Sequence, residues 1–236
     1  MKHPLLRIVI ASILGLLILL FSSILMVTIS GSTSLFKNLP IIEKTFIHTS
    51  MLIFSILFIL ILNKGKLKEY GFVWNKNFPL DKIVLISLFF GFLSDLIDKL
   101  FTNTTSVDPT ASFSFLEQII FIWIWASICE EVLTRGMIQG FLSPLKHIGI
   151  NFFKHYISLP VIVGAIFFGA MHLMLLTLGV NIFAVINIVI FGIILGLIAG
   201  YQKERTNSLI PAIIVHFCFN VGASFLYIFH LFIKLT

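Results

Sequence analysis

The chain has 236 residues, of which 58% are hydrophobic and 11% are charged, and its formal net charge is +6. Soluble globular domains are about 45–50% apolar and about 25% charged. This composition excludes a water-soluble enzyme, a disordered chain and a disulfide-stapled secreted domain. At roughly 20 residues per span, the hydrophobic share would supply about seven membrane helices. We therefore predict an all-α protein, a polytopic transmembrane helical bundle of about seven spans, or eight if one of them breaks.

The apolar segments, taken in chain order, give the predicted spans. The first starts with basic residues, but its apolar run is longer than the roughly 7–15 residues of a cleavable signal peptide, so we expect it to be retained. The fourth and the seventh are long enough to tilt or to break into two pieces. The predicted spans lie near residues 8–28, 46–63, 82–101, 114–142, 160–178, 181–201 and 209–233.

Basic residues are distributed unequally between alternate connections. With the N-terminus inside, the inner segments hold eleven Lys and Arg residues and the outer segments hold three. This asymmetry is the one that the positive-inside rule expects, so the N-terminus is predicted to be cytoplasmic. Surplus positive charge in such a protein fits contact with the anionic headgroups of a bilayer, and we expect no nucleic-acid partner.

Two predicted spans carry glycines at a spacing of four residues. Small residues on one face allow helix backbones to approach closely in lipid. We interpret both sets as packing surfaces, which are Gly136 and Gly140 in the fourth span and Gly192, Gly196 and Gly200 in the sixth.

Ionisable residues are concentrated inside three of the predicted spans. An ionisable group in the bilayer core costs roughly 2.5–3.5 kcal/mol on insertion scales, so each is a candidate functional residue. The fifth span places His172 four residues after Phe168, and the seventh places His216 four residues before Asn220. The fourth span contains Glu130, Glu131 and Arg135.

Helical spacing separates the two glutamates of the fourth span. Glu131 and Arg135 are four residues apart and share a face, where they can pair. Glu130 is about 100° around the helix from Glu131, so it has no obvious local partner. At 1.5 Å per residue, Glu130, His216 and His172 fall about 8, 10 and 18 Å from the inner edge of a core about 30 Å thick. Helix tilt covers this spread, which centres on the inner half of the membrane. We predict that they meet there in an intramembrane polar site.

Structural roles compete with functional ones at several positions. A lone membrane histidine is often only a hydrogen-bonding group between helices. The Glu131–Arg135 pair is more often structural than catalytic, and Asp95 and Lys99 are interpreted as a structural ion pair near the outer interface, with no role assigned to Asp98. Five histidines near helix ends are taken as ordinary interfacial residues: His3, His48, His147, His155 and His230.

Three motifs occur in order on these spans: E-E-x-x-x-R, F-x-x-x-H and H-x-x-x-N. Together they resemble the CAAX prenyl protease and bacteriocin-processing family, also called the CPBP or Abi family, whose members are intramembrane endopeptidases. The resemblance covers roughly residues 114–222. It divides the chain into generic N-terminal spans (1–113), a catalytic core (114–222) and the end of the last span (223–236).

The resemblance implies a mechanism and a kind of substrate. Glu130, with His172, would activate a water molecule for attack on a peptide carbonyl, and His216 and Asn220 would hold the oxyanion. A carboxylate in a poorly solvated site is a better proton acceptor, and fixed donors stabilise an oxyanion strongly in a low dielectric. The substrate would be a membrane-associated protein or peptide. The residues implied to shape the site are Glu131, Arg135 and Phe168.

Metal dependence is left open by both the residues and the resemblance. Two histidines and a glutamate form a known zinc ligand set, so a divalent metal such as zinc would have Glu130, His172 and His216 as candidate ligands. A metal-free scheme uses the same residues. The Phe-, Ile- and Lys-rich composition is compatible with a low-GC bacterium and hence with a bacterial cell membrane.

Two other functions use the same residues. The chain could be a bacteriocin self-immunity protein or peptide-binding membrane protein that needs no hydrolysis. An ion or proton transporter ranks lower, because the two halves of the chain show no matching half-helix breaks.

Overall fold

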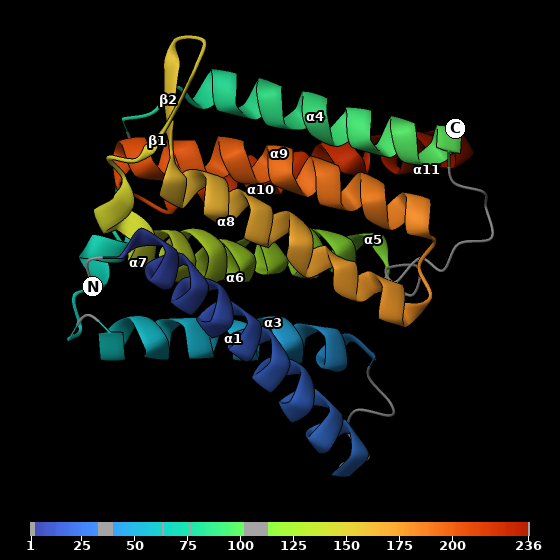
Figure 1. Ribbon diagram of the computed structural model, residues 1–236. Helices are drawn as coiled ribbons and strands as arrows, with labels where there is room; N and C mark the ends of the chain where they lie inside the picture. The colour runs from blue at the N-terminus through green and yellow to red at the C-terminus, as the bar shows by residue number, and fades with distance from the viewer. Residues whose placement is uncertain (1–2, 33–39, 63, 76, 102–112, 236) are drawn as a thin grey trace.

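The computed structural model describes residues 3–32, 40–62, 64–75, 77–101 and 113–235. Its long helices lie roughly side by side, and α1 crosses over α3 at one edge of the bundle (Figure 1). Helix α4 packs on α10, and α8 packs on α9. The long elements are α1 (Pro4–Ser32), α3 (Pro40–Leu62), α4 (Leu80–Phe101), α8 (Leu159–Met171), α9 (Ile182–Thr206), α10 (Ile210–Ala223) and α11 (Phe225–Leu235).

Length and composition identify membrane-crossing helices directly. Within the described ranges, four helices are long and apolar enough to cross a membrane: Pro4–Ile29, Thr45–Leu62, Leu159–Leu178 and Ile182–Thr206. These correspond to the first, second, fifth and sixth predicted spans. The chain is therefore an integral membrane protein of the all-α class, and the total of seven spans stays a prediction.

The fourth predicted span is one helix of mixed type. Ser114 begins it with a capping box, in which the Ser114 hydroxyl accepts from the Glu117 backbone and the Glu117 carboxylate accepts from the Ser114 backbone. Such reciprocal bonds satisfy backbone donors that a helix start leaves unpaired. The helix then runs through α5 (Phe115–Glu117), the π-helix η2 (Gln118–Ala126), α6 (Ser127–Glu131), the π-helix η3 (Val132–Ile138) and α7 (Gln139–Leu142).

The last predicted span breaks in two, as its length allowed. Helix α10 ends at Ala223, Ser224 leaves the helical conformation, and α11 starts at Phe225. The fifth predicted span changes type at His172, where α8 gives way to the 3-10 helix η5 (His172–Leu178). Gly179 ends this turn with a φ of 79°, which glycine adopts without a steric penalty.

One connection contains structure that the sequence did not predict. Strands β1 (Gly149–Phe152) and β2 (His155–Ser158) form an antiparallel hairpin between the η4 turn (Ser143–Leu145) and α8. The hairpin is a small departure from the all-α prediction. It projects from the bundle (Figure 1), and hydrogen bonds of His155 with Tyr201 and of Ser158 with Glu204 tie β2 to the end of α9.

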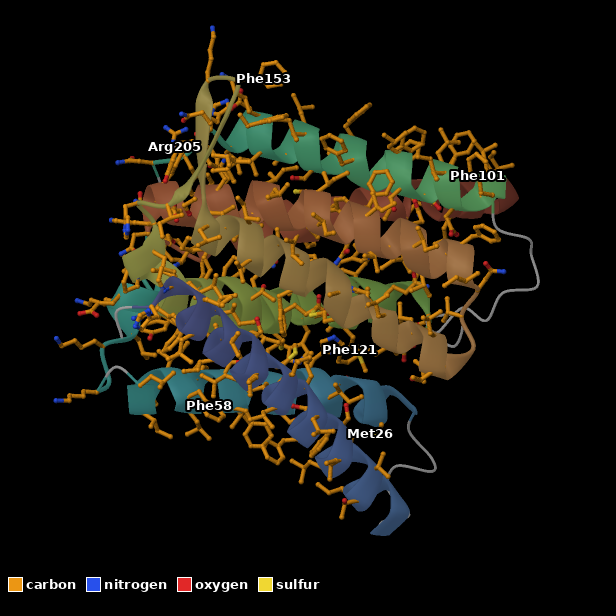
Figure 2. The ribbon with its side chains drawn as sticks, in the orientation of Figure 1. Met26, Phe58, Phe101, Phe121, Phe153 and Arg205 are labelled. Carbon is orange, nitrogen blue, oxygen red and sulfur yellow. The ribbon has the colours of Figure 1, made fainter. Side chains whose placement is uncertain are left out.

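The connections predicted to be cytoplasmic lie at one end of the bundle. Arg7 Nε donates to the Phe141 carbonyl at 2.7 Å, which links the start of α1 to the end of α7. Asn75 Nδ2 donates to the Thr206 carbonyl at 2.9 Å, which links the segment after η1 (Leu67–Tyr70) to the end of α9. Nitrogen-tipped side chains gather at this end, where Arg205 is labelled (Figure 2). The helices thus alternate in direction as the distribution of basic residues predicts.

The glycines of α9 pack as expected. A Cβ at Gly192 would lie 3.2 Å from the Gly169 Cα, and one at Gly196 would lie 2.7 Å from the Ala165 Cα. Both contacts bring the backbones of α8 and α9 together. Gly136 differs, because a Cβ there would meet neighbours only at ordinary distances of 3.7 Å or more.

Gly91 lies at a close approach between α4 and α10. A Cβ at this position would overlap the Phe219 carbonyl oxygen and approach the Ala223 nitrogen. Because backbone atoms cannot give way as a side-chain tip can, overpacking of this kind costs about 1–3 kcal/mol. We expect Gly91→Ala to lower the unfolding temperature measured in detergent. Gly136→Ala is the control, and an equal or larger loss in that variant would contradict the expectation.

Candidate active site

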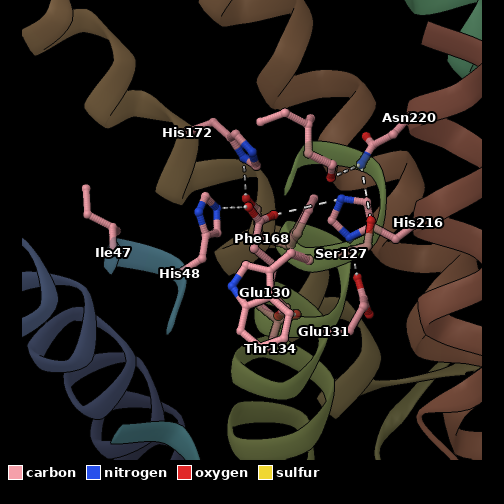
Figure 3. A network of polar contacts seen from close by, with 12 residues as sticks. Ile47, His48, Ser127, Glu130, Glu131, Thr134, Phe168, His172, His216 and Asn220 are labelled. Atoms are coloured by element: carbon pink, nitrogen blue, oxygen red, sulfur yellow. Dashed lines mark hydrogen bonds and ion pairs between the residues drawn. The ribbon is translucent and has the colours of Figure 1, made fainter. Parts of the chain in front are cut away.

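A cavity of about 300 Å³ opens inside the bundle and is lined by the predicted site residues. Its polar walls come from α3, α6, the start of η5 and α10 (Figure 3). The structure thus brings together residues from helices that are far apart in the sequence. The polar lining residues are His48, Glu130, His172, His216 and Asn220, and the apolar ones include Ile47, Met51, Ile122, Met171 and Leu175.

Glu130 lies on the short α-helical piece between the two π-helices. Its Oε1 is 3.2 Å from His48 Nε2, and its Oε2 is 3.9 Å from His216 Nε2. The side chain is 13% exposed, so its carboxylate is mostly withdrawn from the surface. π-Helical turns are uncommon and occur frequently at functional sites, where they change the direction of side chains. Here they flank the residue that the sequence singled out.

A buried ion pair contacts the Nδ1 side of the His216 ring. His216 Nδ1 is 3.0 Å from Glu131 Oε1, and the same oxygen is 3.1 Å from Arg135 Nη1. The side chains of Glu131 and Arg135 have no exposed surface. The i,i+4 pair predicted from spacing is therefore present, and it fixes the orientation of the His216 ring.

The Phe168 ring contacts two of the imidazoles and the Arg135 guanidinium. The ring meets His172 and His216 edge to face, with centroids 5.1 and 5.3 Å apart. The Arg135 guanidinium lies 4.6 Å from the centre of the same ring. The Phe168 carbonyl is 2.9 Å from His172 Nδ1. Because a carbonyl oxygen only accepts, Nδ1 carries a proton, and a neutral His172 has its lone pair on Nε2.

Asn220 is oriented by the fourth-span helix. Its Nδ2 lies 3.3 Å from the Ile122 carbonyl and 3.2 Å from Ser127 Oγ. Ser127 in turn donates to the Trp123 carbonyl at 2.6 Å. Ser127, to which the sequence analysis assigns no role, is fully buried and supports Asn220.

The interpretation of His48 as an ordinary interfacial residue is wrong. Its proximity to the predicted start of the second span suggested an interfacial position, but α3 begins at Pro40, and His48 lies on the wall of the cavity. Its contact with Glu130 spans 82 positions in the sequence, so no local spacing pattern could reveal it. His3, His147 and His155 are exposed, as expected, and the side chain of His230 lies outside the described residues.

The polar group of the third predicted span is separate from the cavity. Lys99 Nζ lies 3.4 Å from Asp95 Oδ1, which confirms the predicted ion pair. The other Asp95 oxygen accepts from the Leu226 backbone at 3.3 Å. Asp95 therefore joins α4 to the start of α11.

The candidate zinc ligands do not form a three-ligand site. Across the part of the chain that the structure describes, no three His, Cys, Asp or Glu side chains are placed to hold one metal ion. One oxygen of Glu130 faces His48, and His172 Nδ1 faces a carbonyl. The mechanism proposed for this cavity therefore contains no metal-dependent step.

Comparison with family models identifies the segment that holds this arrangement. Residues 112–222 match the model described as type II CAAX prenyl endopeptidase, Rce1-like. This segment is similar to the Rce1-like family. The match confirms the family resemblance of the three motifs. Searches of the curated proteins and of the solved structures found no match.

The Rce1-like segment contains most, but not all, of the polar cavity wall. Glu130, His172, His216 and Asn220 lie inside it, whereas His48 lies outside it on α3. The family that this segment matches is a family of endopeptidases. The N-terminal helices nevertheless supply one of the groups that contacts Glu130.

Proposed function

We propose that this protein is an intramembrane endopeptidase that hydrolyses a peptide bond of a membrane-associated protein or peptide. The supporting observation is the Glu130 carboxylate, which shares a cavity within the membrane helices with three imidazoles and an amide. A carboxylate and neutral imidazoles are the groups that take a proton from water. Ionisable residues are rare inside a bilayer, and the position of these residues on the wall of a polar cavity accounts for their presence there.

In the proposed reaction, Glu130 and His172 activate one water molecule. The water oxygen attacks the peptide carbonyl carbon while its proton passes to Glu130 Oε2 or, through it, to His172 Nε2. The tetrahedral intermediate then collapses, the C–N bond breaks, and the stored proton goes to the leaving nitrogen. The products are a carboxylic acid and an amine, and the proton of the acid then passes to the amine to give a carboxylate and an ammonium group, so atoms and charge balance without a further reactant.

His216 and Asn220 stabilise the oxyanion in this scheme. Glu131 accepts from His216 Nδ1, so Nε2 faces the cavity, and His216 donates from Nε2 to the oxyanion as the doubly protonated imidazolium. Asn220 donates to Ile122 and Ser127, and it turns one hydrogen toward the substrate when the oxyanion forms. The Ser127 hydroxyl keeps its own bond to Trp123, so this exchange leaves no unpaired donor behind. A well-placed donor contributes about 10²–10³ in rate.

The proposed placement in the membrane has seven spans and a cytoplasmic N-terminus. Helices α4 and α10, and the mixed helix of residues 115–142, complete the four spans that length and composition identify. The basic connections at one end of the bundle then face the cytoplasm of a bacterial cell. This placement puts the cavity in the inner half of the membrane.

The family description supplies the substrate class for a test. We expect the purified protein in lipid to cleave a farnesylated peptide with a C-terminal CAAX sequence, which releases the last three residues. Mass spectrometry would detect the released tripeptide and, in ¹⁸O-labelled water, one heavy oxygen in the new carboxylate. An intact peptide after incubation with folded protein would contradict this substrate class, and the same peptide without the prenyl group is the control.

A further inference from the structure

We infer that His48 is a positioning residue for Glu130, supplied to the active site by the N-terminal helices. This inference rests on the proposed peptidase function. The family match begins at residue 112, so nothing in the matched segment assigns a role to α3. The direct contact between His48 and the key carboxylate gives that helix a part in the chemistry.

The two oxygens of Glu130 face different histidines. Oε1 lies 3.2 Å from His48 Nε2, and Oε2 lies 3.9 Å from His216 Nε2. Because an ionised carboxylate only accepts hydrogen bonds, His48 Nε2 is the donor. The bond fixes the carboxylate plane and commits Oε1, so Oε2 is the oxygen presented to a water molecule in the cavity. Figure 3 shows His48 and His216 on opposite sides of Glu130.

Partial burial of both side chains strengthens the hydrogen bond between His48 and Glu130. The side chain of His48 is 25% exposed and that of Glu130 is 13% exposed, so bulk water competes only partly for either group. A hydrogen bond to an ionised group is about twice as strong as a neutral one. Without the His48 donor, the carboxylate would rotate toward other partners, and misplacement by about 1 Å can cost about 100-fold in rate.

The backbone around His48 is anchored by separate contacts. Thr49, its neighbour, accepts a hydrogen bond from Trp125 Nε1 at 3.2 Å and donates to the Thr45 carbonyl at 2.8 Å. Met51 packs into the buried core with residues of the Rce1-like segment. Helix α3 is therefore fixed against the site by contacts other than the His48–Glu130 bond.

Variants at these contacts distinguish two roles for His48, which are to position the Glu130 carboxylate or only to hold α3 against the mixed helix. Thr49→Val removes a hydrogen bond from α3 to the mixed helix, one residue from His48, without touching Glu130. His48→Leu removes the donor to the carboxylate, and His48→Gln restores an N–H donor that does not titrate near neutral pH. If His48 only held α3 in place, Thr49→Val and His48→Leu would lower the cleavage rate by similar factors.

The experiment compares kcat, KM and unfolding temperature for these three variants, with wild type and Glu130→Gln beside them, on the farnesylated peptide. We expect His48→Leu to lower kcat about 100-fold with KM and unfolding temperature near those of wild type. His48→Gln should recover most of the rate, and Thr49→Val should keep it. Equal losses in Thr49→Val and His48→Leu, or a His48→Gln variant as slow as His48→Leu, would overturn the inference.

A second measurement does not depend on activity. In protein labelled with ¹⁵N-histidine, the His48 ring signals are assigned by their loss in His48→Gln. We expect Glu130→Gln to shift the His48 Nε2 resonance and to leave that of exposed His155 in place. An unmoved His48 signal would overturn the inference. If wild type cleaves no peptide, the proposed function fails, and this shift alone decides whether His48 and Glu130 are coupled.

Discussion

Glu130→Gln is expected to lower peptide cleavage by about 10²–10⁴-fold while the protein still folds and inserts. Glutamine has nearly the same shape as glutamate, but its amide cannot take a proton from water at neutral pH. General-base catalysis of this kind contributes about 10²–10⁴-fold. The loss should appear in kcat, because the cavity wall and its apolar lining are unchanged.

Glu204→Gln provides a control with the same change of charge. Glu204 accepts a hydrogen bond from Ser158 at 2.6 Å near the end of α9, and it does not line the cavity. Cleavage by Glu130→Gln at a rate close to that of Glu204→Gln would remove Glu130 from the mechanism. A peptide-binding or immunity protein that needs no hydrolysis would protect cells equally well with either variant, so a killing assay separates that alternative.

Local patterns in the sequence predict much of the fold. The Glu131–Arg135 and Asp95–Lys99 pairs are both present, because residues four apart share one helix face regardless of tertiary packing. The convergence of Glu130 with His172 and His216 was also predictable. Each lies well inside its own span, and buried polar groups have few ways to be satisfied in lipid other than by meeting each other.

What could not be predicted depends on how helices pack or locally deform. His48 reaches Glu130 only because α3 lies against the mixed helix, which no spacing within α3 encodes. The π-helical turns on both sides of α6 have no simple residue signature, and they alter the faces that an ideal helix would present. The hairpin of residues 149–158 is too short to give a clear alternating pattern.

The buried pair beneath His216 carries the largest expected effect on stability. Arg135→Met is expected to lower the free energy of unfolding by about 3–5 kcal/mol, because it leaves the Glu131 carboxylate buried without its cation. Both side chains have no exposed surface, so water cannot replace the lost partner. Denaturation in mixed micelles, followed by the fluorescence of the buried Trp123, would measure the change.

A double variant distinguishes lost charge balance from lost packing. Glu131→Gln combined with Arg135→Met removes both charges, and the glutamine oxygen still accepts from His216 Nδ1, which lies 3.0 Å from the glutamate oxygen it replaces. Replacing both partners of a buried pair is often nearly neutral, whereas removing one is costly. We therefore expect the double variant to regain most of the stability lost by Arg135→Met. If both variants are equally unstable, the contact of Arg135 with the Phe168 ring, rather than compensation of Glu131, holds this part of the bundle together.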